Sequence, residues 1–428
     1  MDGAFHENLW NPDEGDFYEI ILGDCYGKKI TLRTCLRTHC SIGTVGDSPE
    51  KYVRSEFGVN AFYIGYHFDK KEDIRFTQLY ARYSELEEWL GERPFRLEHS
   101  KNEEGLSEHV LKFTMPNVKE IDLESFKIRI GYGITIGKGD FWRSQKFETN
   151  AWVSIDVNDE MHVDDFLSIA YHMKSFLTLA TGNEVSILTV SGQKKNGDGT
   201  KAVQIFYHKG ERFSAQKFFE HPYFPFFYES ISERPEFFFQ NWFNLVENLT
   251  PIYDLYFGTV YNPHLYPTNT FLSLAQAIES YHSRTSSNKV ITDESFKQLL
   301  SPILNIIRKI PNPQLRQHFK SRAEYMHRKT LRTRIEELFV KYDKLFSLFI
   351  DNKKRFVEKV VNTRNYYTHY GKDLEKRAAK LLELPFLSDK LRLMLIVILM
   401  KETGFNDKVT EQALRKYMRF TTTKRIYD

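Results

Sequence analysis

The amino-acid sequence predicts an α+β protein, with a β-rich N-terminal domain of the sandwich or barrel-like type followed by an all-α helical bundle. Three observations support this prediction. Apolar residues alternate with a period of two in the first half, recur every three or four residues in the second half, and the two halves carry opposite net charges. With 428 residues, 41% of them hydrophobic and 27% charged, the chain is expected to form about two or three domains.

Short alternating segments separated by turn residues fill residues 17–157. The clearest is 127–136, where Ile128, Ile130, Tyr132, Ile134 and Ile136 face one side, as in a strand with one buried face. Further strands are expected at 151–157, 184–190 and 202–207. A helical stripe from Phe166 to Ala180, capped by Asp164 and ended by Gly182, lies between them. We assign residues 1–260 to this domain, with a subdivision near residue 160 left open.

The second half has the three-to-four spacing of amphipathic helices. Helices are predicted around 271–281, 294–309, 331–350, 352–370, 373–383, 388–402 and 407–420. Pro311 and Pro313 stop the second of these, and Gly371 is a suitable C-terminal stop for the fourth. These helices form a predicted bundle domain over residues 261–428.

Residues 218–243 hold twelve aromatic residues in 26 positions, interrupted by three prolines. One interpretation is an exposed surface that stacks bases or docks a protein trigger. The other is packing between the β-rich part and the following helices. Because few basic residues occur in this segment, packing is the favoured interpretation.

The overall net charge of +3 hides two opposite halves. Residues 261–428 contain 32 Lys and Arg against 17 Asp and Glu, whereas residues 1–260 contain 28 against 40. This asymmetry indicates a C-terminal part that meets a polyanion, or else a basic helical domain with solvated faces. The longest apolar stretch, Leu393–Met400, is too short to cross a membrane, and the three cysteines do not form a disulfide framework, so a cytoplasmic protein is expected.

Two other sequence features have the residue types of ligand sites. Cys35, His39 and Cys40 have the chemistry of soft metal ligands but lack a second Cys/His pair at zinc spacing, so no metal site is predicted. There is no Walker-type phosphate loop, and the glycine-rich segment 192–199 has the character of a hairpin connection, so no cofactor is predicted. The remaining histidines His162, His172, His208 and His221 fall in no ligand pattern.

The fourth predicted helix contains the segment Arg364-Asn365-Tyr366-Tyr367-Thr368-His369. An Arg followed by a His five residues later also occurs at Arg322 and His327, but only Arg364 is followed by Asn. This segment, on a basic C-terminal bundle, resembles the catalytic motif of the HEPN superfamily. The helix FLSLAQAIESYH, the segment RKTLRTRIEELF and a β-rich N-terminal half containing YSELEEWLG are similar to its Apea-like branch in particular.

The resemblance implies a metal-independent ribonuclease that works as a homodimer in abortive defence against phage. His369 would then exchange protons with the ribose 2′-hydroxyl, because histidine is the side chain that ordinarily titrates nearest neutral pH. Arg364 would stabilise charge on the phosphate, and Asn365 would orient the imidazole or hold substrate. Glu279, on the first predicted helix, is a candidate supporting residue that would face the motif and tune His369. Lys353, Lys354, Arg355, Lys359, Lys372, Lys376, Arg377 and Lys380 flank the motif and are candidates for guiding the RNA backbone.

Several alternatives stay open at this point. Arg364 and His369 lie about 140° apart around a helix axis, so either the Arg side chain curls round or two copies share one phosphate. The motif could instead be structural, with Arg364 bonded to an acidic neighbour. The chain could also be a binding module for RNA or a nucleotide whose N-terminal half senses a protein, such as a phage protein trigger, or an adaptor without nucleic acid. The RNA is not specified; a structured loop such as a tRNA anticodon is one candidate by analogy.

Overall fold

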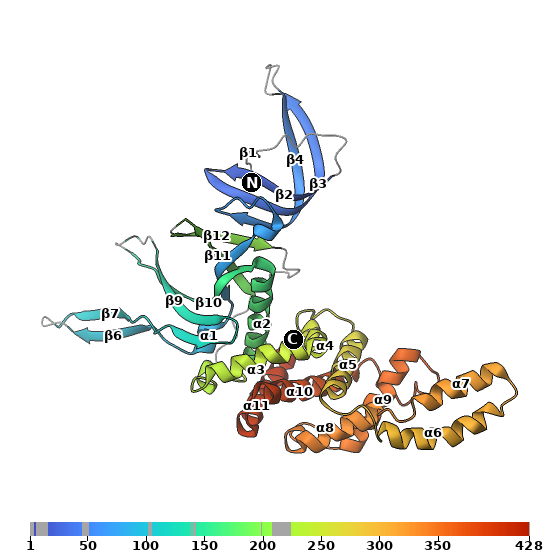
Figure 1. The fold of residues 1–428 in the computed structure, drawn as a ribbon. Coiled ribbons are helices and arrows are strands. Elements are labelled where there is room, and N and C mark those ends of the chain that lie inside the picture. Colours follow the sequence, from blue (N-terminus) through green and yellow to red (C-terminus); the bar gives the residue numbers. More distant parts are fainter. Residues whose placement is uncertain are drawn as a thin grey trace. The chain divides into compact units, whose positions relative to one another are not determined.

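The structure, a computed structural model, describes residues 4–5, 16–44, 51–101, 105–137, 140, 143–197, 199–207 and 224–427. Strands dominate the first half and helices the second (Figure 1), so the α+β class is confirmed. The described residues up to 240, together with residues 419–427, form one compact unit, and residues 241–418 form a second. The predicted boundary at residue 260 coincides with the end of α4 and stays a prediction. In the described part of the chain, no helix is long and apolar enough to span a bilayer.

The first unit is built on one antiparallel sheet of ten strands, in the order β1-β2-β3-β4-β12-β11-β5-β10-β9-β8. The expected sandwich or barrel-like arrangement therefore takes the form of a single sheet whose edge strands are β1 and β8. The strands are β1 (Ala4–Phe5), β2 (Phe17–Cys25), β3 (Lys28–Thr44), β4 (Lys51–Ile64), β5 (Arg75–Tyr83), β8 (Lys119–Asp122), β9 (Lys127–Ile136), β10 (Phe147–His162), β11 (Ile187–Asn196) and β12 (Gly199–Tyr207). A separate two-stranded ribbon consists of β6 (Phe95–Lys101) and β7 (Ser107–Phe113).

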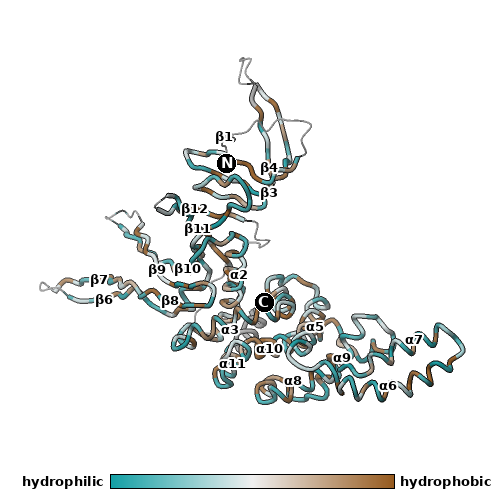
Figure 2. Tube along the Cα trace, in the orientation of Figure 1, coloured by the Kyte–Doolittle hydropathy of each residue, from teal (hydrophilic) through white to brown (hydrophobic). Residues whose placement is uncertain are grey.

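Alternation along the strands sets which face is buried. In Figure 2 hydrophobic and hydrophilic residues alternate along the sheet strands. On β9, Ile128 and Ile130 are buried as predicted, whereas Ile134 and Ile136 are 36% and 61% exposed. The neighbouring strand β8 pairs only with residues 127–130, so the distal part of β9 extends past that strand. Three of the five residues of the predicted apolar face, Ile128, Ile130 and Tyr132, therefore contribute to the core.

Helix α2 (Val163–Thr181) packs against β5 and β10 and supplies many fully buried side chains. Its C-terminal stop is Gly182 at φ 73°, as predicted. The predicted N-cap at Asp164 was wrong, because His162 is the cap and its Nδ1 accepts a hydrogen bond from the Asp164 amide at 3.3 Å. The Asp164 carboxylate instead accepts two hydrogen bonds from the Arg33 guanidinium, both at 2.7 Å.

Two rings of the aromatic segment pack inside the two units, whereas the expected packing between the β-rich part and the following helices stays a prediction; residues 218–223 lie outside the described residues. In the first unit, Phe239 contacts Phe176 of α2, with ring centroids 4.8 Å apart. In the second unit, Trp242 contacts Phe257 edge to face at 6.1 Å. Both Phe239 and Trp242 are fully buried, so burial accounts for these rings without a nucleic-acid partner.

The second unit is helical. Its helices are α4 (Thr250–Val260), α5 (Pro267–Thr285), α6 (Asp293–Arg308), α7 (Pro313–Glu324), α8 (Leu331–Phe346), α9 (Lys353–His369), α10 (Leu384–Thr403) and α11 (Asp407–Tyr427), and α3 (Pro235–Asn248) runs into it. α5 contacts α4, α8, α9 and α10, and the apolar stretch Leu393–Met400 of α10 is wholly buried. The core of the unit therefore lies around α5 and α10.

The sequence did not predict every helix. Helices α3, α4 and α7 were not predicted. α7 begins with Pro313, and Asn312 is its N-cap because Asn312 Oδ1 accepts hydrogen bonds from the Gln314 and Leu315 amides at 2.9 and 3.1 Å. The helix predicted at 373–383 was wrong, because these residues form consecutive turns. Side chains of α9 bond the backbone of this segment, which leaves it non-helical.

Candidate active site

The motif lies in the last turns of α9. The helix begins where Asn352 Oδ1 accepts a hydrogen bond from the Arg355 amide at 2.9 Å. Its buried face consists of Phe356, Val357, Val360 and Thr363. The left-handed residue that ends it is Tyr370, at φ 51°, and not the predicted Gly371. Since this conformation is unfavourable for a residue with a Cβ atom, the backbone directly after His369 is constrained.

Arg364 reaches away from α9 toward α5. Its Nη2 lies 3.2 Å from Oε2 of Glu279, and its Nη1 donates to Oδ1 of Asn365 at 3.4 Å. The side chains of Arg364 and Glu279 are 35% and 29% exposed, so solvent reaches both partners. Glu279 therefore faces the motif through Arg364, and the guanidinium keeps free donors.

His369 is the last residue of α9 and is exposed. Within the described residues it makes no hydrogen bond or ion pair, and Asn365 and Glu279 accept hydrogen bonds from Arg364 and not from the imidazole. The Asn365 amide lies against Arg364 instead. The assignment of Asn365 to orienting the imidazole stays a prediction, as do the assignments of Arg364, His369 and Glu279.

Three tyrosines around His369 pack against one another. The ring centroids of Tyr366 and Tyr367 are 4.9 Å apart, and Tyr370 lies 5.5 Å and 6.0 Å from these two rings. The contacts agree with packing as the main role of these rings. Tyr370 is nevertheless 64% exposed, so one aromatic face next to His369 is open to a ligand.

The candidate RNA-guiding residues fall into two groups. Lys353 lies over the Phe339 ring at 4.9 Å, and Lys359 is bound to the segment after the helix. The others are exposed and form no ion pair with any described residue: Lys354, Arg355, Lys372, Lys376, Arg377 and Lys380. Lys354 and Arg355 lie in the first turn of α9, so four of these cationic side chains, those of Lys372, Lys376, Arg377 and Lys380, lie in the segment that follows His369.

Residues 371–383, which follow the motif, are fastened to α9 by three of its side chains at intervals of four. Lys359 Nζ donates to the Ala378 carbonyl at 3.1 Å, and the Tyr367 hydroxyl donates to the Ala379 carbonyl at 3.1 Å. Between them, the fully buried Thr363 Oγ1 accepts the Ala379 amide at 2.8 Å. Residues 359, 363 and 367 share one helix face, so residues 371–383 are held along two turns of α9. We call residues 371–383 the strap.

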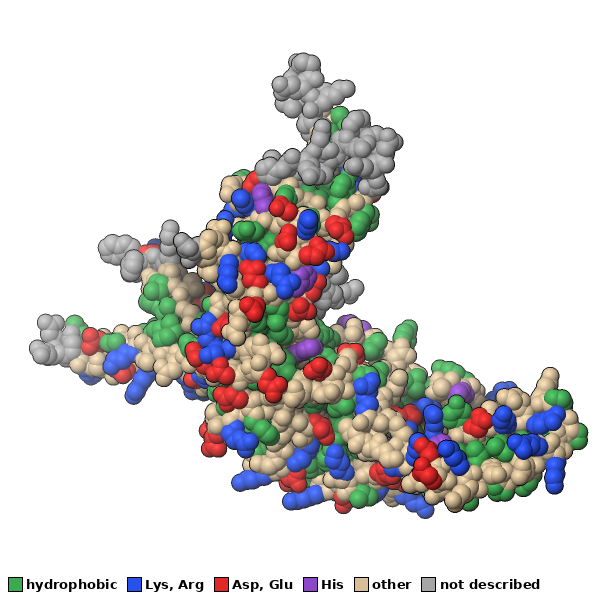
Figure 3. Space-filling view, viewed as in Figure 1, with side chains coloured by type: hydrophobic (Ala, Val, Ile, Leu, Met, Phe, Trp, Pro, Cys, Tyr) green, Lys and Arg blue, Asp and Glu red, His purple; other side chains and the backbone are tan. Residues whose placement is uncertain are grey.

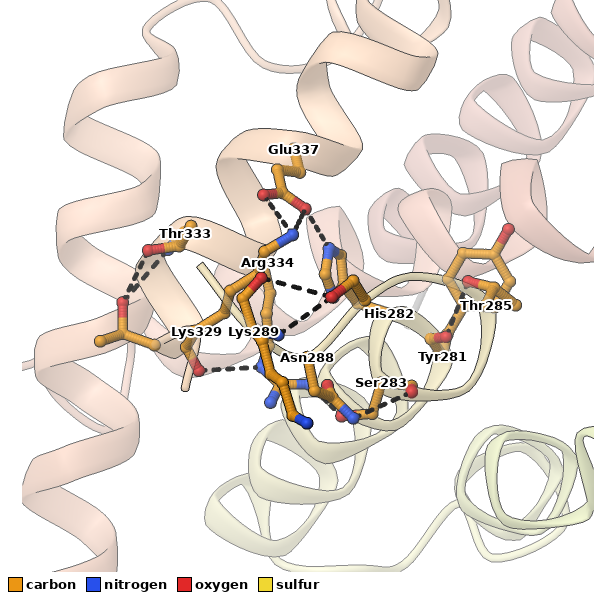
Figure 4. Close-up of polar contacts among 12 residues, drawn as sticks. Tyr281, His282, Ser283, Thr285, Asn288, Lys289, Lys329, Thr333, Arg334 and Glu337 are labelled. Carbon is orange, nitrogen blue, oxygen red and sulfur yellow. Dashed lines mark hydrogen bonds and ion pairs between the residues drawn. The ribbon is translucent and has the colours of Figure 1, made fainter. Parts of the chain in front are cut away.

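Behind Glu279, α5 is joined to α8 by a polar network (Figure 4). Arg334, only 7% exposed, donates to the carbonyl of Glu279 at 3.2 Å and also to Ser283 Oγ. His282 Nε2 lies 2.6 Å from Glu337, whose carboxylate also binds Lys329 at 2.7 Å. The network fixes the turn of α5 that presents Glu279 to Arg364.

Electrostatics in this network favour a neutral histidine. Burial lowers the pKa of His282 below its usual range, although Glu337 opposes this shift. Nδ1 of His282 is buried without a hydrogen-bond partner, so protonating it would place an unpaired N–H in the core. The pKa of Glu337 is held below its ordinary value chiefly by Lys329 and also by His282.

Sequence reasoning did not identify Arg334, Glu337 or Lys329 as neighbours of the motif. All three lie in RKTLRTRIEELF, the segment that is similar to the Apea-like branch, so that similarity was the sequence signal that could have found them. The pairing across α5 and α8 required the fold.

The Cys/His cluster is not brought together as a ligand set. Cys35 is fully buried, and burial raises the pKa of its thiol to about 12, whereas His39 and Cys40 are exposed. In the described part of the chain, no three His, Cys, Asp or Glu side chains converge as a metal site. His208 and His221 lie outside the described residues.

Comparisons with known proteins match two regions of the chain. Residues 3–242, more than half of it, match the family model described as ApeA N-terminal domain 1. Residues 272–409, which include Glu279 and the whole motif, match Apea-like HEPN. No curated protein and no solved structure matches the chain. HEPN domains are generally related to ribonucleases, bind RNA and dimerise, and the two matches associate the chain with HEPN-type nucleases of phage defence.

Proposed function

Since the chain belongs to the Apea-like HEPN family, we propose that it is a metal-independent RNA endonuclease that acts in abortive defence against phage. The observation that carries the proposal is the placement of the motif. Arg364 is partly exposed and held by Glu279, while His369 is exposed without a partner among the described residues, at the constrained end of α9. Both groups are therefore reachable by a phosphate.

The reaction uses the substrate's own nucleophile. His369 accepts the proton of a ribose 2′-hydroxyl, the 2′-oxygen bonds to the adjacent phosphorus, and the bond from phosphorus to the 5′-oxygen breaks. The departing 5′-oxygen takes up a proton. The products are a 2′,3′-cyclic phosphate and a 5′-hydroxyl end, and DNA is not a substrate because it lacks the 2′-hydroxyl. Arg364 stabilises the charge that builds on the phosphate oxygens.

Two copies of the chain share each site. On one helix Arg364 and His369 point about 140° apart. In addition, Glu279 holds Arg364 toward α5. A phosphate that lies where two α9 helices meet can receive Arg364 from one copy and His369 from the other. This arrangement agrees with the dimerisation that is general for HEPN domains.

The N-terminal unit is the sensing part of this cytoplasmic enzyme. A phage protein is the proposed trigger, because the β-rich domain carries the opposite net charge to the helical part and matches a family model of its own. A structured RNA such as a tRNA is the proposed substrate.

The direct test is cleavage of total bacterial RNA by purified full-length protein, with and without EDTA. We expect His369→Ala to abolish cleavage and Arg364→Ala to reduce it by roughly 100-fold or more, as for the loss of a charge-stabilising group. Arg364→Lys should restore part of the rate. His264→Ala is the matched control, because His264 is an exposed histidine of the same unit. Full cleavage by His369→Ala would remove the assignment.

A second candidate function is RNA or nucleotide binding without cleavage. The observation in its favour is the ion pair to Glu279, which already neutralises Arg364. Salt-sensitive RNA binding with intact RNA after long incubation, in the presence of the trigger, would support this candidate.

A further inference from the structure

Helices α6 and α7 form a hairpin that leaves the bundle of the second unit and returns to it (Figure 1). Little of this hairpin is buried. Of the twelve residues of α7 only Ala323 is buried, and on α6 only Phe296 and Ile307 are. The two helices contact each other but present most of their surface to solvent. We call residues 289–329 the arm.

Most of the arm carries positive charge only. From residue 295 to residue 323 there is no Asp or Glu. The same stretch contains six basic residues: Lys297, Arg308, Lys309, Arg316, Lys320 and Arg322. None of them forms an ion pair with a described residue, and Lys and Arg side chains are visible over this part of the surface (Figure 3). Unneutralised cations at this density are the feature that attracts a polyanion.

One face of α7 combines two of these cations with an aromatic ring. Arg316, Phe319 and Lys320 are spaced three and four residues apart, so they share a helix face. The Phe319 side chain is 45% exposed. An exposed ring between two cations fits a single-stranded nucleic acid, whose bases stack on the ring while the phosphates meet the charges.

The base of the arm is firmly attached. Its two ends pair like strands, with the Val290 amide donating to the His327 carbonyl at 2.8 Å and the Lys329 amide to the Asn288 carbonyl at 2.9 Å. The Phe296 ring stacks on His327 with centroids 4.0 Å apart. The arm therefore projects from a closed base and not from two free ends.

This base is joined to the candidate active site through α5. Lys329 binds Glu337, and Glu337 binds His282 (Figure 4). The Arg334 guanidinium donates to the carbonyls of both Lys329 and Glu279, at 3.3 and 3.2 Å. The Glu279 carboxylate in turn holds Arg364. The base of the arm is thus connected to the motif through α5.

We infer that the arm is an RNA-binding element that grips single-stranded RNA outside the cleavage site, with Arg316, Phe319 and Lys320 as its contact face. This inference rests on the proposed function, and it adds a second contact region to the cations near His369. The exposed Leu299 and Ile306 on α6 would suit a protein partner, but the charge of the arm favours a polyanion over a second basic arm.

The test measures RNA binding separately from cleavage. In full-length His369→Ala protein, the variant Arg316→Gln/Phe319→Ala/Lys320→Gln is titrated with a fluorescein-labelled single-stranded RNA of mixed sequence. We expect affinity to fall at least about tenfold at low salt, and the salt dependence to lose a slope of about 1.4 for two phosphate contacts. Lys195→Gln/Lys201→Gln, which removes two exposed lysines of the first unit, is the charge control and should bind like its parent.

Unchanged RNA affinity in the arm variant would overturn the inference. If a lower mass in analytical ultracentrifugation accompanies that result, the arm is instead an interface between copies. Failure of the nuclease proposal is distinguishable: if protein with an intact motif never cleaves RNA while the arm variant loses RNA affinity, the arm inference stands and the cleavage assignment falls.

Discussion

The strap that follows the motif gives a prediction whose size can be worked out from the structure. Thr363→Val keeps the shape of a side chain that is fully buried but removes the oxygen that accepts the Ala379 amide at 2.8 Å. Ala379 is itself only 2% exposed, so water does not replace the lost acceptor. An unsatisfied buried N–H costs about 1–3 kcal/mol. We therefore expect opening of residues 371–383 to become roughly 5- to 150-fold more frequent.

The assay is amide hydrogen exchange followed by mass spectrometry on peptides that cover residues 371–383, in native buffer. Thr363→Ser keeps the acceptor and should retain most of the protection. Thr368→Val is the matched control on the same helix, because its exposed hydroxyl donates to the Arg364 carbonyl at 2.7 Å and its loss should cost less than about 0.5 kcal/mol. Unchanged exchange in Thr363→Val would refute the reasoning that α9 side chains hold this segment.

Three further predictions concern stability. Burial lowers the pKa of His282, so the stability that the neutral imidazole gives the fold is present above about pH 6.5 and is lost as pH falls below that value. The urea midpoint of the wild type should therefore fall between about pH 7.5 and 5.5, and that of His282→Gln should fall less. Burial raises the pKa of Glu85 to about 7, so its ionisation destabilises the fold as pH rises from 4.5 through 7. The urea concentration at the unfolding midpoint should therefore be higher for Glu85→Gln than for the wild type at about pH 8, but not near pH 4.5. Gly192→Ala would place a Cβ atom 2.5 Å from the buried Phe76 ring, and its thermal unfolding should show a loss of about 1–3 kcal/mol.

Much of the fold was predictable because burial imposes a period on the sequence. The alternation in residues 127–136 and the apolar stripes of α5 and α8 were sufficient to predict a strand and two helices. The period predicts the strand but does not always predict burial, because Ile134 and Ile136 continue the alternation of β9 and are exposed. It also fails for residues 373–383, whose helical composition is overridden by hydrogen bonds from α9.

The candidate site was predictable only in part. The motif is local in sequence, so Arg364, Asn365 and His369 could be chosen before the fold was known. Glu279 on α5 was expected to face the motif and tune His369, whereas in the structure it pairs with Arg364 at 3.2 Å. The hydrogen bond from Arg334 that holds the Glu279 backbone could not be predicted. It joins residues 55 positions apart through a backbone carbonyl, which no side-chain pattern encodes.

The claim that two copies share one site has a direct measurement. Arg364→Ala chains and His369→Ala chains are each inactive under the proposal, and the two are mixed in equal amounts by co-expression and assayed for RNA cleavage. Half of the dimers then carry one of each chain, and one of their two sites receives an intact Arg364 and an intact His369, so the account predicts about a quarter of the wild-type rate. A mixture as inactive as its components would contradict the shared site, and full activity of either variant alone would contradict the mechanism.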